Sequence, residues 1–422
     1  MPRTALSRIT FVCVILWIVA QVFLILQASG MQPISDSAYY LRLALTCLNA
    51  GGAYPLPVQI EIEPFIVNPG YINVLAGAIG LGGADTAGLW LNLLFNCALL
   101  WILYRLVDRM AGRRTALVFV ILFCLLPSNS YIVMGYMSDL PCLAVACGAL
   151  LLATYPGGRP MALAGLLLVV ANYIRPVAMI FALTLAVCVL LSHAKPERWI
   201  ALILMMVTAT AALWLVNGAI SGTRFCFANT GGVNALQGAN DTADGGYNGL
   251  ILMEGHEGYI SDSTGFNAFQ RDSVWKERAL DWALANPGRF ARLAPRKLYM
   301  QLFCDSYHLN LFRETAEIMK SPDGTLSARA KKQIVLESIP YYLLLLLAGA
   351  GAVIALRSRR RRKLALVLLT PIVLNLLLAI ATVGGPRYHY PAMPAFIFLA
   401  SLAIVWICHR VKAYRKYRVR TL

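Results

Sequence analysis

Residues 11–26 read FVCVILWIVAQVFLIL and contain no charged side chain. Extended to residues 9–28, this stretch is long enough to cross a bilayer as a helix, which needs about 20 apolar residues. Similar apolar runs recur at residues 89–106, 161–170 and 342–356. Of the 422 residues 59% are hydrophobic and 14% are charged, whereas soluble domains are roughly half apolar and a quarter charged. The sequence therefore predicts an all-α, polytopic integral membrane protein.

The apolar pattern predicts about ten membrane spans. They cover residues 9–28, 86–107, 115–135, 139–155, 160–174, 176–192, 199–217, 337–356, 364–382 and 390–409. No small-residue cleavage site follows the first run, so we expect it to remain as a span. The segment 69–83 is apolar too, but it is short and rich in glycine. We expect a re-entrant or interfacial helix there.

The distribution of charge predicts the orientation of the spans. With a cytoplasmic N-terminus, 21 of the 37 lysines and arginines fall in cytoplasmic segments, together with only two acidic residues, Asp108 and Glu197. Cytoplasmic loops of membrane proteins are enriched in Lys and Arg. This predicts that both termini are cytoplasmic, and the separation would vanish if residues 69–83 crossed the membrane. The net charge of +17 is thus a topology signal, not the mark of a nucleic-acid partner.

Two long outer segments divide the chain. Residues 29–85 form the first outer loop within an N-terminal membrane module, 1–217. Residues 218–336 form an outer insert, and residues 337–422 form a C-terminal membrane module with a basic tail. Within the insert we expect a turn-rich start, then helices at 271–285 and 289–303, separated by Asn-Pro-Gly. Cys226 and Cys304 lie on the outer side, and their spacing leaves open whether they form a disulfide.

Polar residues collect at the outer ends of the predicted spans rather than in their middles. Ion-coupled transporters and proton pumps carry ionisable groups near the bilayer centre. The pattern therefore favours an active or binding cleft on the outer face over a path through the membrane.

Two acids stand where outer helices begin. Asp36 precedes a helix expected from about Ser37, and Asp139 precedes Leu140-Pro141 at the next outer helix start. Both positions suit helix capping. Two acids on one face also suit acid–base catalysis or cation binding. Both interpretations stay open from the residues alone.

Basic and aromatic residues accompany these acids. Arg175 and Arg387 lie at outer span ends, where a guanidinium can bind phosphate oxygens or reach lipid headgroups. Tyr39 and Tyr40, directly after Asp36, and Tyr388, directly after Arg387, are placed as interfacial anchors or as walls of a cleft.

Several of these segments together resemble the C-type glycosyltransferases of the bacterial family-39-like group. This group includes protein O-mannosyltransferases, the aminoarabinose transferase of lipid A and lipopolysaccharide sugar transferases. The matching segments, in chain order, are Asp36-Ser37-Ala38-Tyr39-Tyr40, Asn68-Pro69-Gly70-Tyr71, Ser138-Asp139-Leu140-Pro141, Ile174-Arg175-Pro176, Thr230–Asn234 with Gly238-Ala239-Asn240, Asn286–Arg289 with Lys297, and Pro386-Arg387-Tyr388 through Pro391. The chain departs from the family at Ser37, where a second acid is usual, and at Asp241, where Asn is usual.

The resemblance implies a GT-C-type bundle in the bacterial inner membrane, with its active site on the periplasmic face. It implies inverting transfer of a sugar from a polyprenyl-phosphate donor to a lipid, glycan or protein acceptor. The roles it implies are Asp36 as general base with Asp139 beside it, Arg175, Arg387 and Lys297 on the donor phosphate, and Tyr39, Tyr40, Tyr388 and Asn234 along the substrate cleft.

Some alternatives remain at this stage. A divalent cation, Mg²⁺ or Mn²⁺, held by Asp36 and Asp139 is one open possibility. A lipid-linked glycan ligase or polymerase would use the same kind of outer cleft. A transporter or flippase is disfavoured, because it predicts polar groups in the middles of the spans and paired inverted repeats, and the sequence shows neither. A non-catalytic assembly protein stays open, and it would tolerate Asn at position 36.

Overall fold

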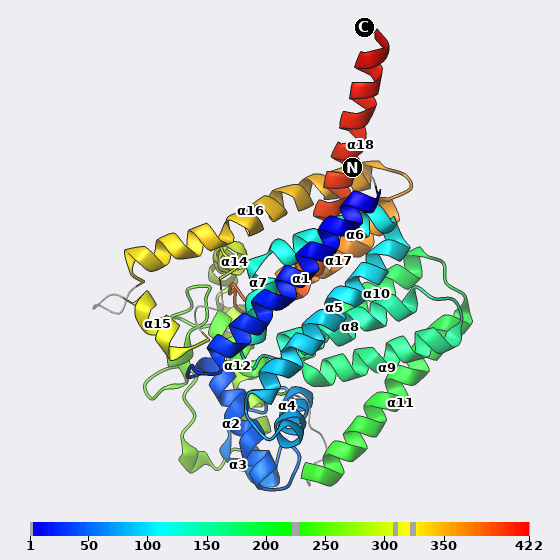
Figure 1. The fold of residues 1–422 in the computed structure, drawn as a ribbon. Coiled ribbons are helices and arrows are strands. Elements are labelled where there is room, and N and C mark those ends of the chain that lie inside the picture. The colour runs from blue at the N-terminus through cyan, green and yellow to red at the C-terminus, as the bar shows by residue number, and fades with distance from the viewer. Residues whose placement is uncertain (1–2, 222–227, 307–310, 321–325, 422) are drawn as a thin grey trace.

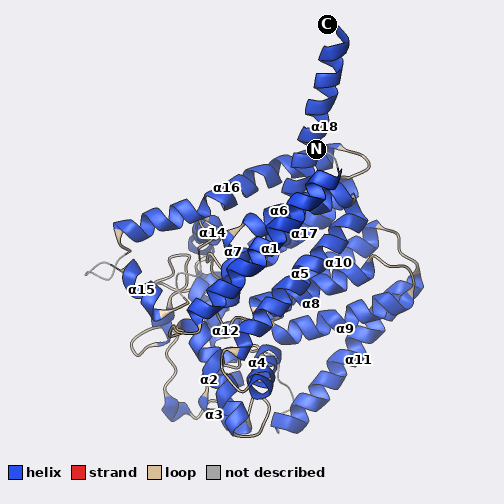
Figure 2. Cartoon of the chain, viewed as in Figure 1, coloured by secondary structure: helices blue, strands red, loops and turns tan. Residues whose placement is uncertain are grey.

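The computed structural model describes residues 3–221, 228–306, 311–320 and 326–421. Over these ranges the chain forms helices and loops but no β-strand (Figure 2). The only extended pairing in the described ranges consists of two isolated bridges, Pro33–Phe312 and Lys320–Leu326. The all-α prediction is confirmed.

Each of the ten predicted spans coincides with a helix or a pair of helices. Six helices in the described ranges are long and apolar enough to cross a membrane. They are α1 (Arg3–Ala28), α5 (Ala87–Ala111), α11 (Pro196–Ser221), α16 (Ala328–Arg357), α17 (Arg362–Ala381) and α18 (Met393–Thr421). Three predicted spans are shorter helices, namely α8 (Asp139–Ala153), α9 (Gly158–Ile174) and α10 (Met179–Leu191), the last preceded by the 3₁₀ turn η2 (Pro176–Ala178). The protein is a multi-pass membrane protein.

The span predicted at residues 115–135 is broken. It consists of α6 (Arg113–Leu125) and α7 (Pro127–Tyr131), continued by the turn η1 (Ile132–Met134), and the two parts are bent by 73°. Proline lacks the amide hydrogen that a helix interior requires, so Pro127 ends α6 and begins the next segment.

The helices pack as a bundle, with α11 along one edge (Figure 1). α18 packs on α16 and α6 and is the most buried of the long spans. Of its most apolar 18-residue stretch, 67% is buried inside the protein. α16 and α18 approach closely because Gly351 has no side chain, and a Cβ there would lie 1.9 Å from Leu399 O. α11 packs on α9, and only 6% of its most apolar 18-residue stretch is buried, as expected for a helix that faces lipid.

Basic side chains gather at one end of the bundle. Arg109 and Arg198 both bond the turn after α8, at residues 153–155, and Lys363 Nζ bonds Leu191 O at 2.8 Å. The first residues of α1 and the end of α18 lie at this same end (Figure 1). That this end faces the cytoplasm remains a prediction from the charge pattern.

The opposite end carries the short helices. α2 (Ser35–Asn49), α3 (Pro57–Ile62) and α4 (Pro69–Gly82) lie there, and α4 packs on α2, α5 and α9 (Figure 1). α4 is the short helix expected at residues 69–83.

The insert contributes α12 (Gly231–Gly238), the turns η3 (Gly249–Leu252) and η4 (Asp262–Thr264), α13 (Ala268–Ala285), α14 (Pro287–Leu302) and α15 (Arg313–Met319). The two predicted insert helices are thus α13 and α14. A further turn, η6 (Tyr390–Ala392), precedes α18. Cys226 lies outside the described residues, so whether it pairs with Cys304 stays open.

Candidate active site

A cavity of about 870 Å³ opens where the membrane helices meet the insert. Its floor is formed by the starts of α2 and α8 and the end of α9. α10 and α17 form one wall, and α12 and α13 form the other. The charged residues along the lining are Asp36, Asp139, Arg175, Asp272, Lys276 and Arg387. Four of the five acids and bases predicted for the site therefore meet in one cavity.

Arg387 joins the two predicted acids. Its Nη1 lies 2.6 Å from Asp36 Oδ2, and its Nε lies 3.0 Å from Asp139 Oδ2. Arg175 Nη1 also lies 3.0 Å from Asp139 Oδ2. Two carboxylates and two guanidiniums thus form one network, although they come from four separate segments of the chain.

The structure decides between the capping and pairing interpretations of the acids. α2 begins after Ile34 and α8 begins after Ser138, and neither helix start has a side-chain capping bond. Asp36 and Asp139 lie in the first turns of these helices, where helix dipoles favour negative charge. Their carboxylates bond the arginines instead of backbone amides, so the capping interpretation is wrong.

The ion pairs set the charge of Asp36. Partial burial acts to raise the pKa of this carboxyl, but the adjacent Arg387 guanidinium, its hydrogen bond and the charge of Arg175 outweigh burial. The pKa of Asp36 therefore lies below its ordinary value of 3.8. The carboxylate is ionised at neutral pH, as a proton acceptor must be. Its side chain is 48% exposed, while that of Asp139 is 4% exposed. Asp36 is thus the acid that a substrate can reach.

A second set of hydrogen bonds fixes the floor of the cavity. Asn68 Nδ2 donates to both Tyr40 Oη and Ser138 Oγ at 2.9 Å, and Arg175 Nη1 donates to the same Ser138 hydroxyl at 3.0 Å. Asn68 has φ of 33° and ψ of 61°, a left-handed conformation that Asn adopts more readily than most residues. Sequence reasoning gave Asn68 and Ser138 no role, although both stand in segments that carry the family resemblance.

A third network holds the loop that carries Arg387. Gln301 Nε2 donates to Asn375 Oδ1 at 2.8 Å, and Asn375 Nδ2 donates to Tyr388 O at 2.9 Å. His389 is buried beside this network. Its Nδ1 lies 2.8 Å from Gln301 O, and its Nε2 lies 3.1 Å from Asp305 Oδ1. Asn375, an amide inside an otherwise apolar span, is the signal in the sequence that points to this network.

His389 and Asp305 form a buried pair. A carbonyl oxygen only accepts, so Nδ1 carries a proton toward Gln301 O. The pair is 1% exposed on both sides, and it ties the end of α14 to the loop before α18.

Two predicted site residues lie elsewhere. Tyr39 Oη donates to Glu63 Oε2 at 2.8 Å and does not line the cavity. Lys297 is fully buried, donates to Ile380 O at 2.9 Å and lies over the Phe290 ring. Burial lowers the pKa of Lys297 to about 8. It too is absent from the cavity lining. A helix periodicity shows a face but not what packs on that face, so neither placement could be read from the sequence.

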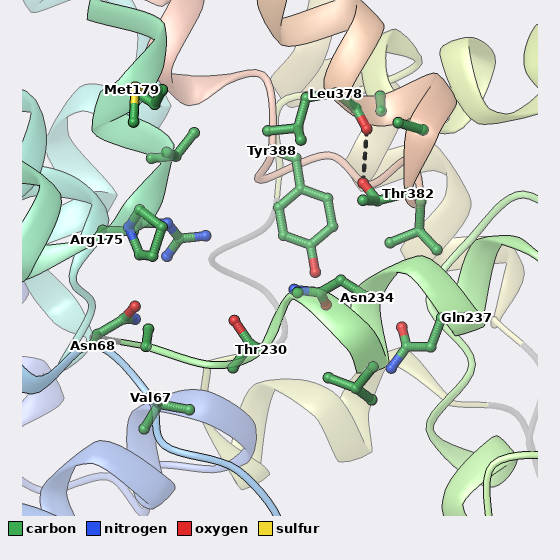
Figure 3. Close-up of a pocket in the computed structure, with 18 of the residues that line it drawn as sticks. Val67, Asn68, Arg175, Met179, Thr230, Asn234, Gln237, Leu378, Thr382 and Tyr388 are labelled. Carbon is green, nitrogen blue, oxygen red and sulfur yellow. Dashed lines mark hydrogen bonds between the residues drawn. The ribbon is translucent and has the colours of Figure 1, made fainter. Parts of the chain in front are cut away.

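The remaining predicted residues do line the cavity. Tyr40, Tyr388 and Asn234 are all among its lining residues. In Figure 3 the Tyr388 ring points into the space, with its hydroxyl toward Asn234. Burial raises the pKa of Tyr40 to about 12, so its hydroxyl is neutral at physiological pH and can donate a hydrogen bond.

Asp36 and Asp139 do not fit a divalent cation in this arrangement. The Arg387 guanidinium lies between their carboxylates, where a shared cation would be held, and it would repel the metal. Ser37 stands where the family that the sequence resembles usually has a second acid, so this position adds no carboxylate. The Ser37 hydroxyl accepts a hydrogen bond from Tyr136 N. Within the described ranges no group of three His, Cys, Asp or Glu side chains is placed to bind a metal. We therefore derive no step through a metal ion.

Comparison with known proteins gives matches at the level of structure alone. No family model and no curated protein matches the sequence. Archaeal oligosaccharyltransferase AglB from Archaeoglobus fulgidus, in complex with an inhibitory peptide and a dolichol-phosphate, matches with a TM-score of 0.55 and 12% identity over 97% of this chain. Its apo form matches with a TM-score of 0.52 and 13% identity over 97% of this chain. This chain spans about half of that protein, 52% in each case.

A third structure is ArnT from Cupriavidus metallidurans bound to undecaprenyl phosphate. The match covers 93% of this chain and 77% of the ArnT chain, at 12% identity. Its TM-score of 0.39 is too low to support a structural argument. The AglB matches are sufficient for the fold. The GT-C-type bundle expected from the sequence segments is confirmed.

Proposed function

We propose that this protein is a membrane glycosyltransferase that moves a sugar from a polyprenyl-phosphate donor to a cell-envelope lipid, glycan or protein acceptor. The single observation that carries the proposal is the Asp36–Arg387–Asp139–Arg175 network at the floor of a large cavity. It combines an ionised, accessible carboxylate with two guanidiniums, which is what glycosyl transfer from a phosphate carrier needs.

The cavity has an apolar arm suited to a lipid carrier. Its wall between α10 and α17 contains Met179, Ile180 and Leu183 from one helix and Leu374, Leu377 and Leu378 from the other. Met179, Leu183, Leu377 and Leu378 are each at least 42% exposed. Exposed apolar side chains at membrane depth face lipid, so a polyprenyl chain can reach the arginines from the side of the bundle.

The proposed reaction is a single displacement. The acceptor hydroxyl oxygen attacks the anomeric carbon and passes its proton to the Asp36 carboxylate. The bond from the anomeric carbon to the phosphate oxygen breaks, and polyprenyl phosphate leaves with the electron pair. Arg175 and Arg387 stabilise the charge that grows on that phosphate. Arg175 uses Nη1 for the carboxylates, and Arg387 uses Nη1 and Nε. Other N–H donors of both guanidiniums therefore remain for phosphate oxygens.

The decisive experiment is transfer by the purified, reconstituted protein. We expect a radiolabelled sugar to pass from synthetic polyprenyl-phosphate sugars to extracted cell-envelope acceptors, in the presence of EDTA as in its absence. Nucleotide sugars should give no product. Transport of the donor across the bilayer without any transfer product would contradict the proposal and favour a flippase. Products carrying long glycans would favour a ligase or polymerase.

The lipid arm gives a separate prediction. Leu183→Trp should fill the groove between α10 and α17 and raise KM for a long-chain donor by roughly tenfold, about 1.4 kcal/mol of binding. A donor with a short, water-soluble prenyl chain should be affected little. Leu190→Trp is the matched control, because Leu190 lies on the same helix, is 62% exposed and does not line the cavity. Equal KM changes in both variants would contradict donor access at this groove.

A further inference from the structure

Two buried side-chain amides at the cavity each have one polar atom without a hydrogen-bond partner among the described residues. Gln237 is 2% exposed, and its Oε1 accepts no hydrogen bond from the described residues. Asn229 is 8% exposed, and its Nδ2 likewise has no acceptor there, although its Oδ1 accepts from Ile66 N. Both residues line the cavity. Buried polar groups are rarely left without partners, so each such atom calls for an explanation.

These atoms do not stand alone. Thr230, Asn234, Tyr247 and Tyr388 line the same space, and all offer hydroxyl or amide groups. Figure 3 shows Tyr388 and Asn234 between Arg175 on one side and Gln237 on the other. A ligand whose phosphate meets Arg175 therefore extends toward a wall of uncharged hydrogen-bonding groups.

Every ionised side chain of the lining already has an ionic partner. Asp36 and Asp139 pair with Arg387 and Arg175. On the insert side Asp272 accepts from Gly232 N at 2.6 Å and pairs with Lys276 Nζ at 2.5 Å. Three carboxylates thus face three cations. Apart from the arginine N–H groups proposed for the donor phosphate, the lining offers no unpaired charge to a sugar.

We infer that the transferred sugar is uncharged, and that Gln237 and Asn229 bind its hydroxyl groups. This inference rests on the proposed function and adds the class of sugar. A hydroxyl both donates and accepts, so it can satisfy the carbonyl of Gln237 and the amide hydrogens of Asn229. An ammonium on the sugar would have to take a carboxylate from its arginine. A sugar carboxylate would meet no cation on the amide wall, because Lys297, behind Gly238, does not line the cavity.

The test compares donors that share a ring and differ in charge. Polyprenyl-phosphate arabinose is paired with its 4-amino-4-deoxy analogue, and polyprenyl-phosphate galactose with the galacturonic acid donor. We expect the neutral member of at least one pair to be transferred about 100-fold faster than its charged analogue, because a buried polar site discriminates strongly against mismatched groups.

Variants at Gln237 connect this selectivity to the proposed wall. Gln237→Glu adds a carboxylate and should raise the ratio of amino-pentose to pentose transfer by about tenfold. Gln237→Met keeps the shape, removes the acceptor and should raise KM for the neutral donor. Gln270→Glu is the control, because it adds the same charge at an exposed position outside the lining and keeps the capping box with Asn267. Thermal unfolding of each variant checks that the insert is intact.

The outcomes separate the two proposals. A charged sugar transferred as fast as its neutral partner would overturn the inference and leave the glycosyltransferase assignment standing. An unchanged sugar preference in folded Gln237→Glu and Gln237→Met would overturn the role of Gln237. Absence of transfer from every donor would overturn the proposed function and this inference with it.

Discussion

Replacing Asp36 by Asn should reduce sugar transfer by about 100- to 10,000-fold, the usual cost of removing a general base. The substitution keeps the size of the side chain and its position in the first turn of α2, but the amide cannot take the acceptor proton. Because Asp36 does not cap α2, the helix should be retained. The measurement is the initial rate of transfer at equal thermal stability of both proteins.

The matched control is Asp262→Asn in the insert. Asp262 is a fully exposed acid that also pairs with an arginine, Arg271, so the variant removes one carboxylate and one surface ion pair away from the cavity. We expect its transfer rate to equal that of the unmodified protein. Full activity of Asp36→Asn would remove this carboxylate from the chemistry and return it to a structural role.

Much of the membrane architecture was predictable from the sequence because it rests on local properties. Apolar runs of sufficient length predicted every long helix, and Asn286-Pro287-Gly288 separated α13 from α14 as proline and glycine do. The break between α6 and α7 was not predicted, although Pro127 was visible. In an apolar sequence a proline can either kink a span or end it, and the choice depends on neighbouring helices.

The candidate site was partly predictable for a different reason. Asp36, Asp139, Arg175 and Arg387 were found because ionisable residues are scarce beside the spans, so each one stands out. Tyr39 and Lys297 lie outside the cavity lining, and the sequence could not show this because their partners, Glu63 and Ile380 O, are distant in sequence. The neutral groups Asn68, Gln237, Gln301 and Asn375 were missed since amides carry no charge signal and acquire roles only through packing.

Replacing Arg387 should be as damaging as replacing Asp36, but for two reasons. Arg387→Met removes a cation placed for the leaving phosphate, which should cost about 100- to 1,000-fold in rate. It also leaves Asp36 without its nearest cation, so burial raises the pKa of Asp36 above its present value. The acid limb of the pH–rate profile, expected below pH 3.8 in the unmodified protein, should move to higher pH.

The two reasons can be separated with a double variant. In the Asp36→Asn background the base is already absent, so an Arg387 that only positions and ionises Asp36 would cost nothing further when it is removed. An Arg387 that also stabilises the departing phosphate should cost a second, nearly full factor in the residual rate. Arg387→Lys refines the result, because an ammonium keeps the charge but cannot bridge two carboxylates as a planar guanidinium does. We expect Arg387→Lys to restore part of the transfer rate but little of the lowering of the Asp36 pKa. Full recovery by lysine would show that charge alone matters, and that the bridge between Asp36 and Asp139 is incidental to transfer.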